Sequence, residues 1–559
     1  MRSSILAIAA VLALPACTTM SDTPPGASAQ PAPSSVTPSI DTMKRLTAQL
    51  SSDAFEGRAP GSAGEEKTLA LLVSEFSRLG LKPGNEGSWF QDVPLVEITA
   101  KNVSALSFTG GKAPVTAAYG PEMVIGTYRT TQPHIAVKDS PVVFVGYGIN
   151  APEKGWNDYA GLDVKGKTVI ILVNDPDYET PGLAGTFNGR AMTYYGRWTY
   201  KYEEAARQGA AAAIIVHDTV PAAYGWNVVQ SSWTGAQHVA DSANGNADQS
   251  AAIGWIQKDK AQALFASAGL DLDAQMRAAK QPGFKAVPLT GVKADVSFDN
   301  ELRKHSSKNV VALLPGKTRP DEYVLYSAHW DHLGHCQAAP DGDDICNGAV
   351  DNATGTAALV ALAEANVKAG PTDRSQVFLA ITAEESGLLG SAYYGDNPVF
   401  PFAKTVGGVN MDALSLAGLA KNVVVIGKGK SQLDAYLDRA LGAQGRVATN
   451  EPTPEKGFYY RSDHFSFAKH GLPMLYFEGG EDLVNGGTAA GLAAAEDYTR
   501  NRYHGPKDEY DPNWDWTGVA ADLKLYYDVG RALADTTDWP NWMEGDEFRA
   551  IRDQDRAGK

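Results

Sequence analysis

The sequence predicts an α/β protein with a mainly parallel central sheet, helices on both faces of that sheet, and an inserted β-rich module. Three observations support this fold class. From Asn300 onward, apolar strand-like runs alternate with helical patterns at βαβ spacing, which favours parallel strands covered on both faces. Acidic and imidazole residues follow several of these runs. Between about 93 and 287, short strand-like runs dominate instead, and only 200–209 is helix-like.

Length and charge narrow the functional class. The chain has 559 residues, which is long enough for more than one domain. Its 49 Lys and Arg stand against 65 Asp and Glu, for a net charge of −16. This balance argues against nucleic acid as a partner, because nucleic-acid recognition needs a basic patch.

The first residues, MRSSILAIAAVLALPAC, predict a bacterial export signal, since the apolar run is too short to span a bilayer. Its end, Leu14 to Cys17, resembles a lipobox, in which Cys17 becomes the lipidated N-terminus. Thr18 is not Asp, so an outer-membrane lipoprotein facing the periplasm or cell surface is expected, with membrane contact only through the lipid. The alternative is a plain secretory signal in which Cys17 is incidental.

Two further cysteines, Cys336 and Cys346, flank a short acidic loop. In an oxidising compartment they are expected to form a local disulfide. A structural zinc site is the competing interpretation, but it needs a second cysteine pair.

Element by element, the pattern begins with a helix at 40–50, a Gly/Pro loop, and an amphipathic helix ending near Gly80. The β-rich module follows, then the alternating strands and helices, and a closing amphipathic helix after about 521. The predicted organisation is a signal peptide at 1–17, a disordered tether at 18–39, a first part of the main α/β domain at 40–92, an insert at 93–287, the second part of the main domain at 288–545 and a charged tail at 546–559.

The chemistry-bearing residues stand just past the apolar runs. The run 323–328 is followed by His329 and Asp331, and the run 377–382 by Glu384 and Glu385; further along the chain are Asp351, Asp412 and His504. In an open α/β sheet such positions converge at the carboxyl ends of the strands. Imidazole and carboxylate ligands without thiolate favour a hydrolytic zinc site, and two divalent ions need a bridging carboxylate between them.

The segments AHWDHLG, GAVDNATGTAAL, TAEESGLLGSAYY, NMDAL and RYHGPKDEYD resemble those of the co-catalytic zinc aminopeptidase family, which also contains glutamate carboxypeptidase. EGRAPGSAGEEK and YRSDHFSFAKHGLP match other recurring stretches of that family. The insert, with GYGINAPEKGWNDYAGLDVKGKTVIILVND, resembles the protease-associated domain that such enzymes often carry. The resemblance implies the zinc aminopeptidase fold, two zinc ions per chain and a peptide substrate.

The resemblance also implies roles for individual residues. His329 and Asp412 would bind one zinc ion, Glu385 and His504 the other, and Asp351 would bridge them. Glu384 would be the general base for a zinc-bridging water, Asp331 would orient His329, and Tyr503 would donate to the oxyanion. The Asp351–Asn352 peptide bond would be cis. The alternatives are a helix N-cap for Asp331 and simple packing for Tyr503; His332 and His335 are expected to be structural.

The loop 456–473 is expected to shape the substrate pocket, with Arg461 as a substrate-anchoring residue; a surface ion pair is its alternative. One Arg beside aromatic residues fits an apolar side-chain pocket better than a multi-Arg clamp for glutamate. The predicted function is therefore an aminopeptidase that releases apolar or aromatic N-terminal residues. Two alternatives stay open: a carboxypeptidase or dipeptidase of the glutamate carboxypeptidase type, and a non-catalytic binding module on the same fold.

Overall fold

The structure is a computed structural model that describes residues 35–557. The expected export signal, with Cys17, lies outside the described residues, as does most of the expected tether. Among the described residues, no helix combines the length and the apolar character needed to cross a bilayer.

The sheet that carries the candidate site is mixed, with four parallel strands at its centre. Its order is β1–β13–β17–β14–β18–β21–β19–β20, with β17, β14, β18 and β21 parallel. The expected mainly parallel sheet with helices is thus present. Its strands are β1 (Lys82–Pro83), β13 (Val287–Leu314), β14 (Arg319–His329), β17 (Arg374–Ile381), β18 (Thr405–Asn410), β19 (Asn422–Ile426), β20 (Val447–Asn450) and β21 (Met474–Gly479).

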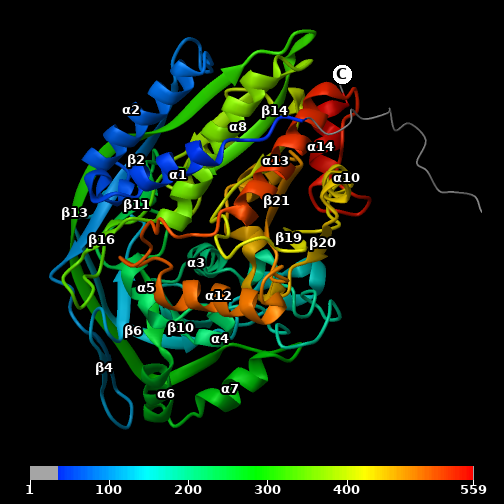
Figure 1. The fold of residues 1–559 in the computed structure, drawn as a ribbon. Coiled ribbons are helices and arrows are strands. Elements are labelled where there is room, and N and C mark those ends of the chain that lie inside the picture. The colour runs from blue at the N-terminus through cyan, green and yellow to red at the C-terminus, as the bar shows by residue number, and fades with distance from the viewer. Residues whose placement is uncertain (1–34, 558–559) are drawn as a thin grey trace, which may run out of the picture.

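Helices cover both faces of this sheet, as Figure 1 shows for α2, α8 and α13 on one side. The sequence of α8 is nearly all apolar and its residues are buried all round, as expected for a helix packed between a sheet and other helices. The first face carries α1 (Ile40–Leu50), α2 (Ala63–Arg78), α8 (Gly355–Ala369), α10 (Asp434–Gln444) and α13 (Thr517–Asp535). The core of the other face includes residues of α9 (Leu389–Asp396) and α11 (His464–Ala468).

The strands of the insert continue the same sheet through β13 but surround a core of their own. Their order is β4–β3–β13–β6–β9–β10–β12–β5, and β6, β9, β10 and β12 run parallel. The expected helix at 200–209 corresponds to α3 (Trp198–Arg207). The other elements are β3 (Leu106–Thr109), β4 (Val115–Ala117), β5 (Met123–Gly126), β6 (His134–Phe144), β9 (Thr168–Leu172), β10 (Ala212–His217), β12 (Ala252–Gln257), α4 (Thr219–Ala222), α5 (Trp226–Trp233), α6 (Lys258–Ser267) and α7 (Leu272–Ala279).

Two long strands run through both parts of the molecule. β13 pairs with β6 and β3 near its start, then with β2 (Phe90–Lys101), and at its end with β17. β11 (Ala236–Ala240) pairs with the other edge of β2. The core of the insert includes Phe298, beyond the boundary expected at 287. The insert is therefore joined to the rest of the molecule by the paired strands β2 and β13, which form a continuous β-ribbon, and not by a linker.

The end of the chain is packed, which differs from the charged tail expected at 546–559. Helix α14 (Arg549–Arg556) lies in this segment, and Arg552 is 1% exposed. The Arg552 guanidinium donates hydrogen bonds to the carbonyl oxygens of Phe402, Thr405 and Val406. A charge-rich segment looks solvated in the sequence, but these backbone carbonyls give its arginine buried hydrogen-bond acceptors.

Candidate metal centre

The central strands deliver the expected ligands to one edge of the sheet. β14 ends at His329, Glu384 stands three residues after β17, and Asp412 stands two residues after β18. These strands are parallel neighbours, so their carboxyl ends meet at the same edge. Asp351 lies in an irregular turn, Ala349–Thr354, that leads into α8. His504 follows α12 (Gly487–Asn501).

The chain turns sharply beside three of these residues. Ala383, Ala413 and His504 have φ values of 53°, 48° and 56°, in the left-handed region that residues other than glycine seldom adopt. Asn352 links the irregular turn before α8 to the turn at Ala413, because its side-chain oxygen accepts from the backbone N–H of Ala413 at 3.2 Å. The peptide bond between Asp351 and Asn352 is cis, as the family resemblance implies.

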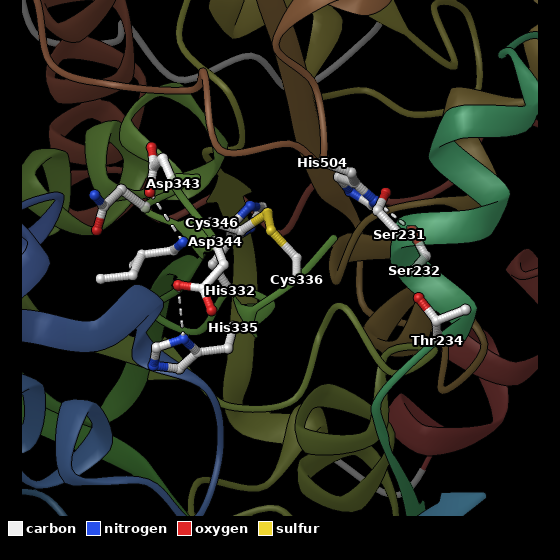
Figure 2. The surroundings of a disulfide bond; sticks show 12 residues. Ser231, Ser232, Thr234, His332, His335, Cys336, Asp343, Asp344, Cys346 and His504 are labelled. Carbon is white, nitrogen blue, oxygen red and sulfur yellow. Dashed lines mark hydrogen bonds and ion pairs between the residues drawn. A yellow bond between two sulfur atoms is a disulfide. The ribbon is translucent and has the colours of Figure 1, made fainter. Parts of the chain in front are cut away.

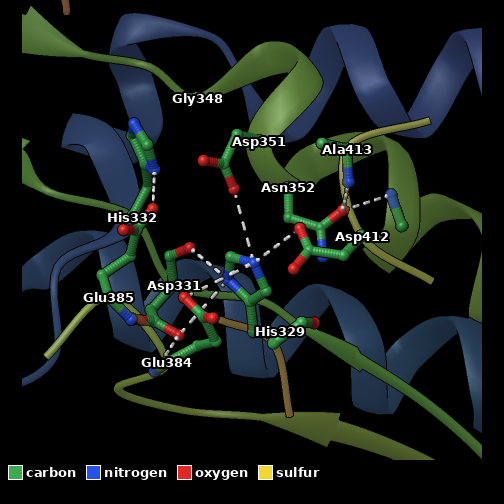
Figure 3. A network of polar contacts seen from close by, with 12 residues as sticks. His329, Asp331, His332, Gly348, Asp351, Asn352, Glu384, Glu385, Asp412 and Ala413 are labelled. Carbon is green, nitrogen blue, oxygen red and sulfur yellow. Dashed lines mark hydrogen bonds and ion pairs between the residues drawn. The ribbon is translucent and has the colours of Figure 1, made fainter. Parts of the chain in front are cut away.

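Asp351 lies between two imidazoles, and each of its oxygens faces one of them. Its Oδ1 is 3.4 Å from Nε2 of His329, and its Oδ2 is 3.4 Å from Nε2 of His504. The same nitrogen of His329 is 3.2 Å from Oδ1 of Asp412, and that of His504 is 3.1 Å from Oε2 of Glu385. Figure 3 shows His329 with Asp351 and Asp412 converging on it. Asp351 is thus placed to share a ligand set with each histidine.

The carboxylates of this cluster raise the pKa values of its two histidines, His329 and His504, so both imidazoles tend to take up protons. Burial alone lowers the pKa of His329, but the carboxylates of Glu384 and Asp412 outweigh it and raise that pKa well above its ordinary value. Burial likewise opposes protonation of His504, yet Glu385 and Asp351 raise its pKa to about 10. Bound cations would supply the charge that the histidines otherwise take from protons.

The donor set fits zinc. His329, Asp351 and Asp412 offer ligand atoms that all lie within 4.8 Å of one another, and so do His332, Asp351 and Glu385. Nitrogen and carboxylate oxygen donors without thiolate suit a hydrolytic zinc site. The five ligand residues expected from the sequence are therefore all present at one place.

The two glutamates differ in their surroundings. Glu385 contacts His504 through Oε2 and His332 through Oε1, the latter at 2.5 Å from Nδ1. Oε2 of Glu384 is 3.9 Å from Nε2 of His329, a longer distance than the 3.1 Å between Glu385 and His504. Burial, with Asp412 and Glu385 nearby, raises the pKa of Glu384 well above its ordinary value. Glu385 thus contacts two imidazoles, whereas burial raises the proton affinity of Glu384.

Asp331 is buried behind both groups. Its Oδ1 accepts from the backbone N–H of Glu384 at 3.1 Å, and its Oδ2 from that of Glu385 at 3.4 Å. Oδ1 is also 3.7 Å from Nδ1 of His329. No helix begins at Asp331 in the described chain, so the helix-cap alternative is wrong. The carboxylate therefore holds the glutamate turn, whereas the backbone carbonyl oxygen of Asp331 contacts Nδ1 of His329 at 3.2 Å.

Tyr503 and Arg461 form a pair beside the site. Nη2 of Arg461 lies 3.3 Å from the Tyr503 hydroxyl and donates to it. The Arg461 guanidinium also lies over the rings of Phe458 and Tyr224, at 5.1 and 5.4 Å from their centroids. Its contacts in the described chain are thus rings, a hydroxyl and a carbonyl, rather than the carboxylate of the surface ion-pair alternative.

Cys336 and Cys346 form a disulfide. It closes the short hairpin of β15 (Gly334–His335) and β16 (Ile345–Cys346), with His335 exposed and paired to Asp344 at 3.2 Å. Figure 2 shows the disulfide and His332 close together.

Three supporting residues escape sequence reasoning. The hydroxyl of Ser232, in α5 of the insert, lies 2.9 Å from Nδ1 of His504 (Figure 2). The buried carboxylate of Asp508 accepts from the backbone N–H groups of Val350 and Asp351. His332, expected to be structural, contacts Glu385 directly. The position of Asp508 within the RYHGPKDEYD segment and of His332 within AHWDHLG was the only signal for these two residues, and Ser232 had none.

A cavity of about 340 Å³ opens beside the metal ligands. Its walls come from both parts of the molecule: the insert contributes Tyr224, and the peptidase part contributes the loop of Arg461 and helix α12. A second cavity, of about 220 Å³, reaches the same glutamates and His504 from the side of α5. The candidate centre is therefore buried yet open to two cavities.

Comparison with known proteins agrees with this geometry. Residues 309–527 match the family described as Peptidase family M28. The chain is similar to aminopeptidase NAALADL1 of Mus musculus, 32% identical over 140 residues, which are 23% of this chain and 17% of that protein. It is also similar to a glutamate carboxypeptidase 2 homolog of Caenorhabditis elegans, 30% identical over 139 residues, or 24% of this chain and 16% of that protein. The matched stretch thus spans less than a fifth of these relatives.

A solved structure extends the likeness to the whole fold. The aminopeptidase from Aneurinibacillus sp. strain AM-1 superposes with a TM-score of 0.53 at 19% identity, covering 90% of this chain and 95% of that one. The α/β architecture with a large central sheet is therefore shared with that aminopeptidase. The stretch that matches the Peptidase family M28 model, residues 309–527, contains the whole histidine and carboxylate cluster.

Proposed function

We propose that this protein is a zinc exopeptidase with two zinc ions per chain, and that it removes N-terminal residues from peptides. The observation that carries the proposal is the Asp351 carboxylate, whose two oxygens face His329 and His504 at 3.4 Å each. Asp412 and Glu385 complete the two ligand sets. A pair of zinc ions would polarise the scissile carbonyl and lower the pKa of a water between them.

The chain's own residues account for the remaining steps. Glu384, whose pKa burial raises, is placed to take a proton from the attacking water and pass it to the leaving amine. Asp331 holds the backbone of Glu384 and Glu385 in place. The Tyr503 hydroxyl, which accepts from Arg461, has its own proton left to donate to the developing oxyanion.

Exopeptidase action at the N-terminus rests on the charges beside the ligands. A free α-ammonium group needs carboxylates, and Glu384 and Asp412 both line the larger cavity. A terminal carboxylate needs several cations. Of the three Lys and Arg side chains that line this cavity, Arg461 is committed to Tyr503 and to two aromatic rings, Arg502 is paired with Asp497, and Lys456 remains. This distribution favours the aminopeptidase, while the similarity to a glutamate carboxypeptidase 2 homolog keeps carboxypeptidase action as the second candidate.

The decisive experiment uses one peptide with free ends and two blocked forms, assayed with zinc. We expect N-terminal acetylation to abolish cleavage and C-terminal amidation to leave it unchanged. The reverse pattern would replace the aminopeptidase with the carboxypeptidase. Absence of cleavage in all three, with less than one zinc bound per chain, would favour a non-catalytic binding module.

The cavity supports a preference for apolar or aromatic N-terminal residues. Apolar side chains from Leu416, Val424, Ile426 and Phe458 line it. Glu451 and Glu478 also line it, but burial raises their pKa values to about 8 and about 7, so at pH 7 Glu451 is mostly protonated and Glu478 is about half protonated. Leucine and phenylalanine p-nitroanilides should therefore be cleaved faster than the lysine derivative at pH 7; a faster lysine substrate would contradict the preference.

We further propose that the insert is a protease-associated domain and that the chain is exported and anchored by a lipid on Cys17. Tyr224 of the insert in the cavity wall supports the first part. The Cys336–Cys346 disulfide supports an oxidising compartment. Labelling cells with a fatty-acid analogue should mark the wild-type protein but not Cys17→Ser; equal labelling of both would contradict lipidation at this cysteine.

A further inference from the structure

A second histidine and carboxylate cluster lies outside the candidate catalytic ligands, where the insert joins the long β-ribbon. In the pairing of β11 with β2, His238 is directly opposite Glu97. In the pairing of β13 with the other edge of β2, His305 is opposite Leu95, two residues before Glu97. Side chains alternate along a strand, so Leu95 and Glu97 share a face with their partners. Three adjacent strands therefore place one carboxylate and two imidazoles on one face.

The distances among these groups match a shared ion. Nδ1 of His238 is 3.2 Å from Nε2 of His305. One ligand atom from each of Glu97, His238 and His305 lies within 4.8 Å of the others. Two nitrogens bound tetrahedrally to zinc at ordinary bond lengths stand about 3.3 Å apart. The histidine pair thus already has the separation that coordination requires.

The chemical state of the three groups also suits coordination. Burial, with His305 nearby, lowers the pKa of His238 to about 4, and burial with Arg303 lowers that of His305. Both imidazoles are therefore neutral near pH 7, which is the form that binds metals. Arg303 pairs with Oε2 of Glu97 and leaves the other carboxylate oxygen for an ion.

We propose that Glu97, His238 and His305 form a third metal site, which takes a divalent ion of the zinc class through three protein ligands and one water. Three ligands with an open fourth position are a common zinc arrangement. The site would tie β11 of the insert to both strands of the ribbon.

The position of the site gives the ion a structural consequence. β11 begins three residues after α5, which carries Ser232, and Gln237 donates to the Ser232 carbonyl at 3.0 Å. Ser232 in turn contacts His504, and His238 lines the same cavity as His504. An ion that fixes β11 would therefore fix the wall of the insert that faces the candidate catalytic centre.

The test counts metal. The intact protein is dialysed against buffered zinc, and its zinc content is measured by mass spectrometry for wild type, His238→Gln/His305→Gln, and His134→Gln. His134 is an exposed histidine of the same sheet, paired with Asp299, and controls for incidental surface binding. We expect the double variant to hold one zinc fewer than wild type and the control to hold the same number. Equal content in wild type and double variant would overturn the proposal.

A second variant separates this site from the proposed catalytic one. Asp351→Asn removes the candidate bridge and should still bind one zinc ion, with a rise in melting temperature on zinc addition. The rise should disappear when His238→Gln/His305→Gln is added. If the double variant folds poorly, zinc-edge diffraction from wild-type crystals decides: an anomalous peak among Glu97, His238 and His305 is expected, and no peak there at full catalytic occupancy refutes the site.

Discussion

At the scale of single residues, the candidate site depends on which atoms face which. Asp351 offers one oxygen to each histidine, and Asp331 holds the glutamate turn through two backbone N–H groups. Three of the flanking positions, Ala383, Ala413 and His504, adopt left-handed backbone conformations. Such conformations cost free energy and persist where the surroundings enforce them. The site is thus built from constrained turns rather than from regular elements.

The first prediction separates the two adjacent glutamates. Glu384→Gln should keep its zinc and lose activity by about 10²–10⁴-fold, because the general base is removed. Glu385→Gln should bind zinc more weakly, because Glu385 contacts His504 at 3.1 Å. Metal content and kcat, measured on both variants, check the assignment. A Glu384 variant without zinc beside a fully loaded Glu385 variant would reverse the two roles.

The second prediction concerns Ser232, whose hydroxyl lies 2.9 Å from Nδ1 of His504. Partners of a metal-binding imidazole orient the ring, and their loss typically weakens metal affinity about 10–100-fold. We expect Ser232→Ala to lower zinc affinity within that range, as measured by competition with a chelator. Ser231→Ala is the matched control, since the Ser231 hydroxyl contacts only backbone carbonyls of α5. Equal affinities in the two variants would assign Ser232 no such role.

The candidate ligands could be predicted from the sequence because each stands just past an apolar run or inside a recognisable segment. His329, Glu385 and Asp412 follow strands that end at one sheet edge. Ser232 could not be predicted, since it is 272 positions from His504 in the sequence and lies in a short helix of the insert. Likewise, nothing local to His238 indicates that Glu97 is its cross-strand partner.

At the scale of elements, periodicity predicted the helices well and the strands less well. The expected helices at 40–50 and after 62 are α1 and α2, each with an apolar face in the core. By contrast, β13 runs unbroken from Val287 to Leu314 through the polar stretch NELRKHSSK. This stretch remains a strand because β2 pairs with it along its whole length. Because β2 and β13 are far apart in the sequence, their pairing leaves no local sequence pattern from which the strand could be predicted.

The third prediction belongs to the β15–β16 hairpin. Cys336→Ser/Cys346→Ser should lower the free energy of unfolding by about 2–3 kcal/mol, because the disulfide closes a short loop. Urea denaturation checks this value. A reductant should produce the same loss in wild type and no change in the variant. A variant as stable as the oxidised wild type would show that the disulfide adds nothing to stability.

At the scale of the whole molecule, the insert and the peptidase part share β2 and β13 rather than a flexible linker. Each part has its own core, yet both contribute to the cavities beside the metal ligands. Because Tyr224 and Ser232 come from the insert, substrate access and the setting of His504 depend on how the two parts are joined. The ribbon fixes that geometry, and a metal ion at His238 would strengthen it.

The most direct test of the central claim is a zinc titration of chelator-treated enzyme, with cleavage of a leucine p-nitroanilide as the readout. The account predicts no activity in the metal-free enzyme and recovery that is complete only when both ligand sets around Asp351 are filled. Asp351→Asn should recover none of it, because each histidine then loses the shared carboxylate. Activity that survives complete metal removal, or full activity in Asp351→Asn, would contradict the account.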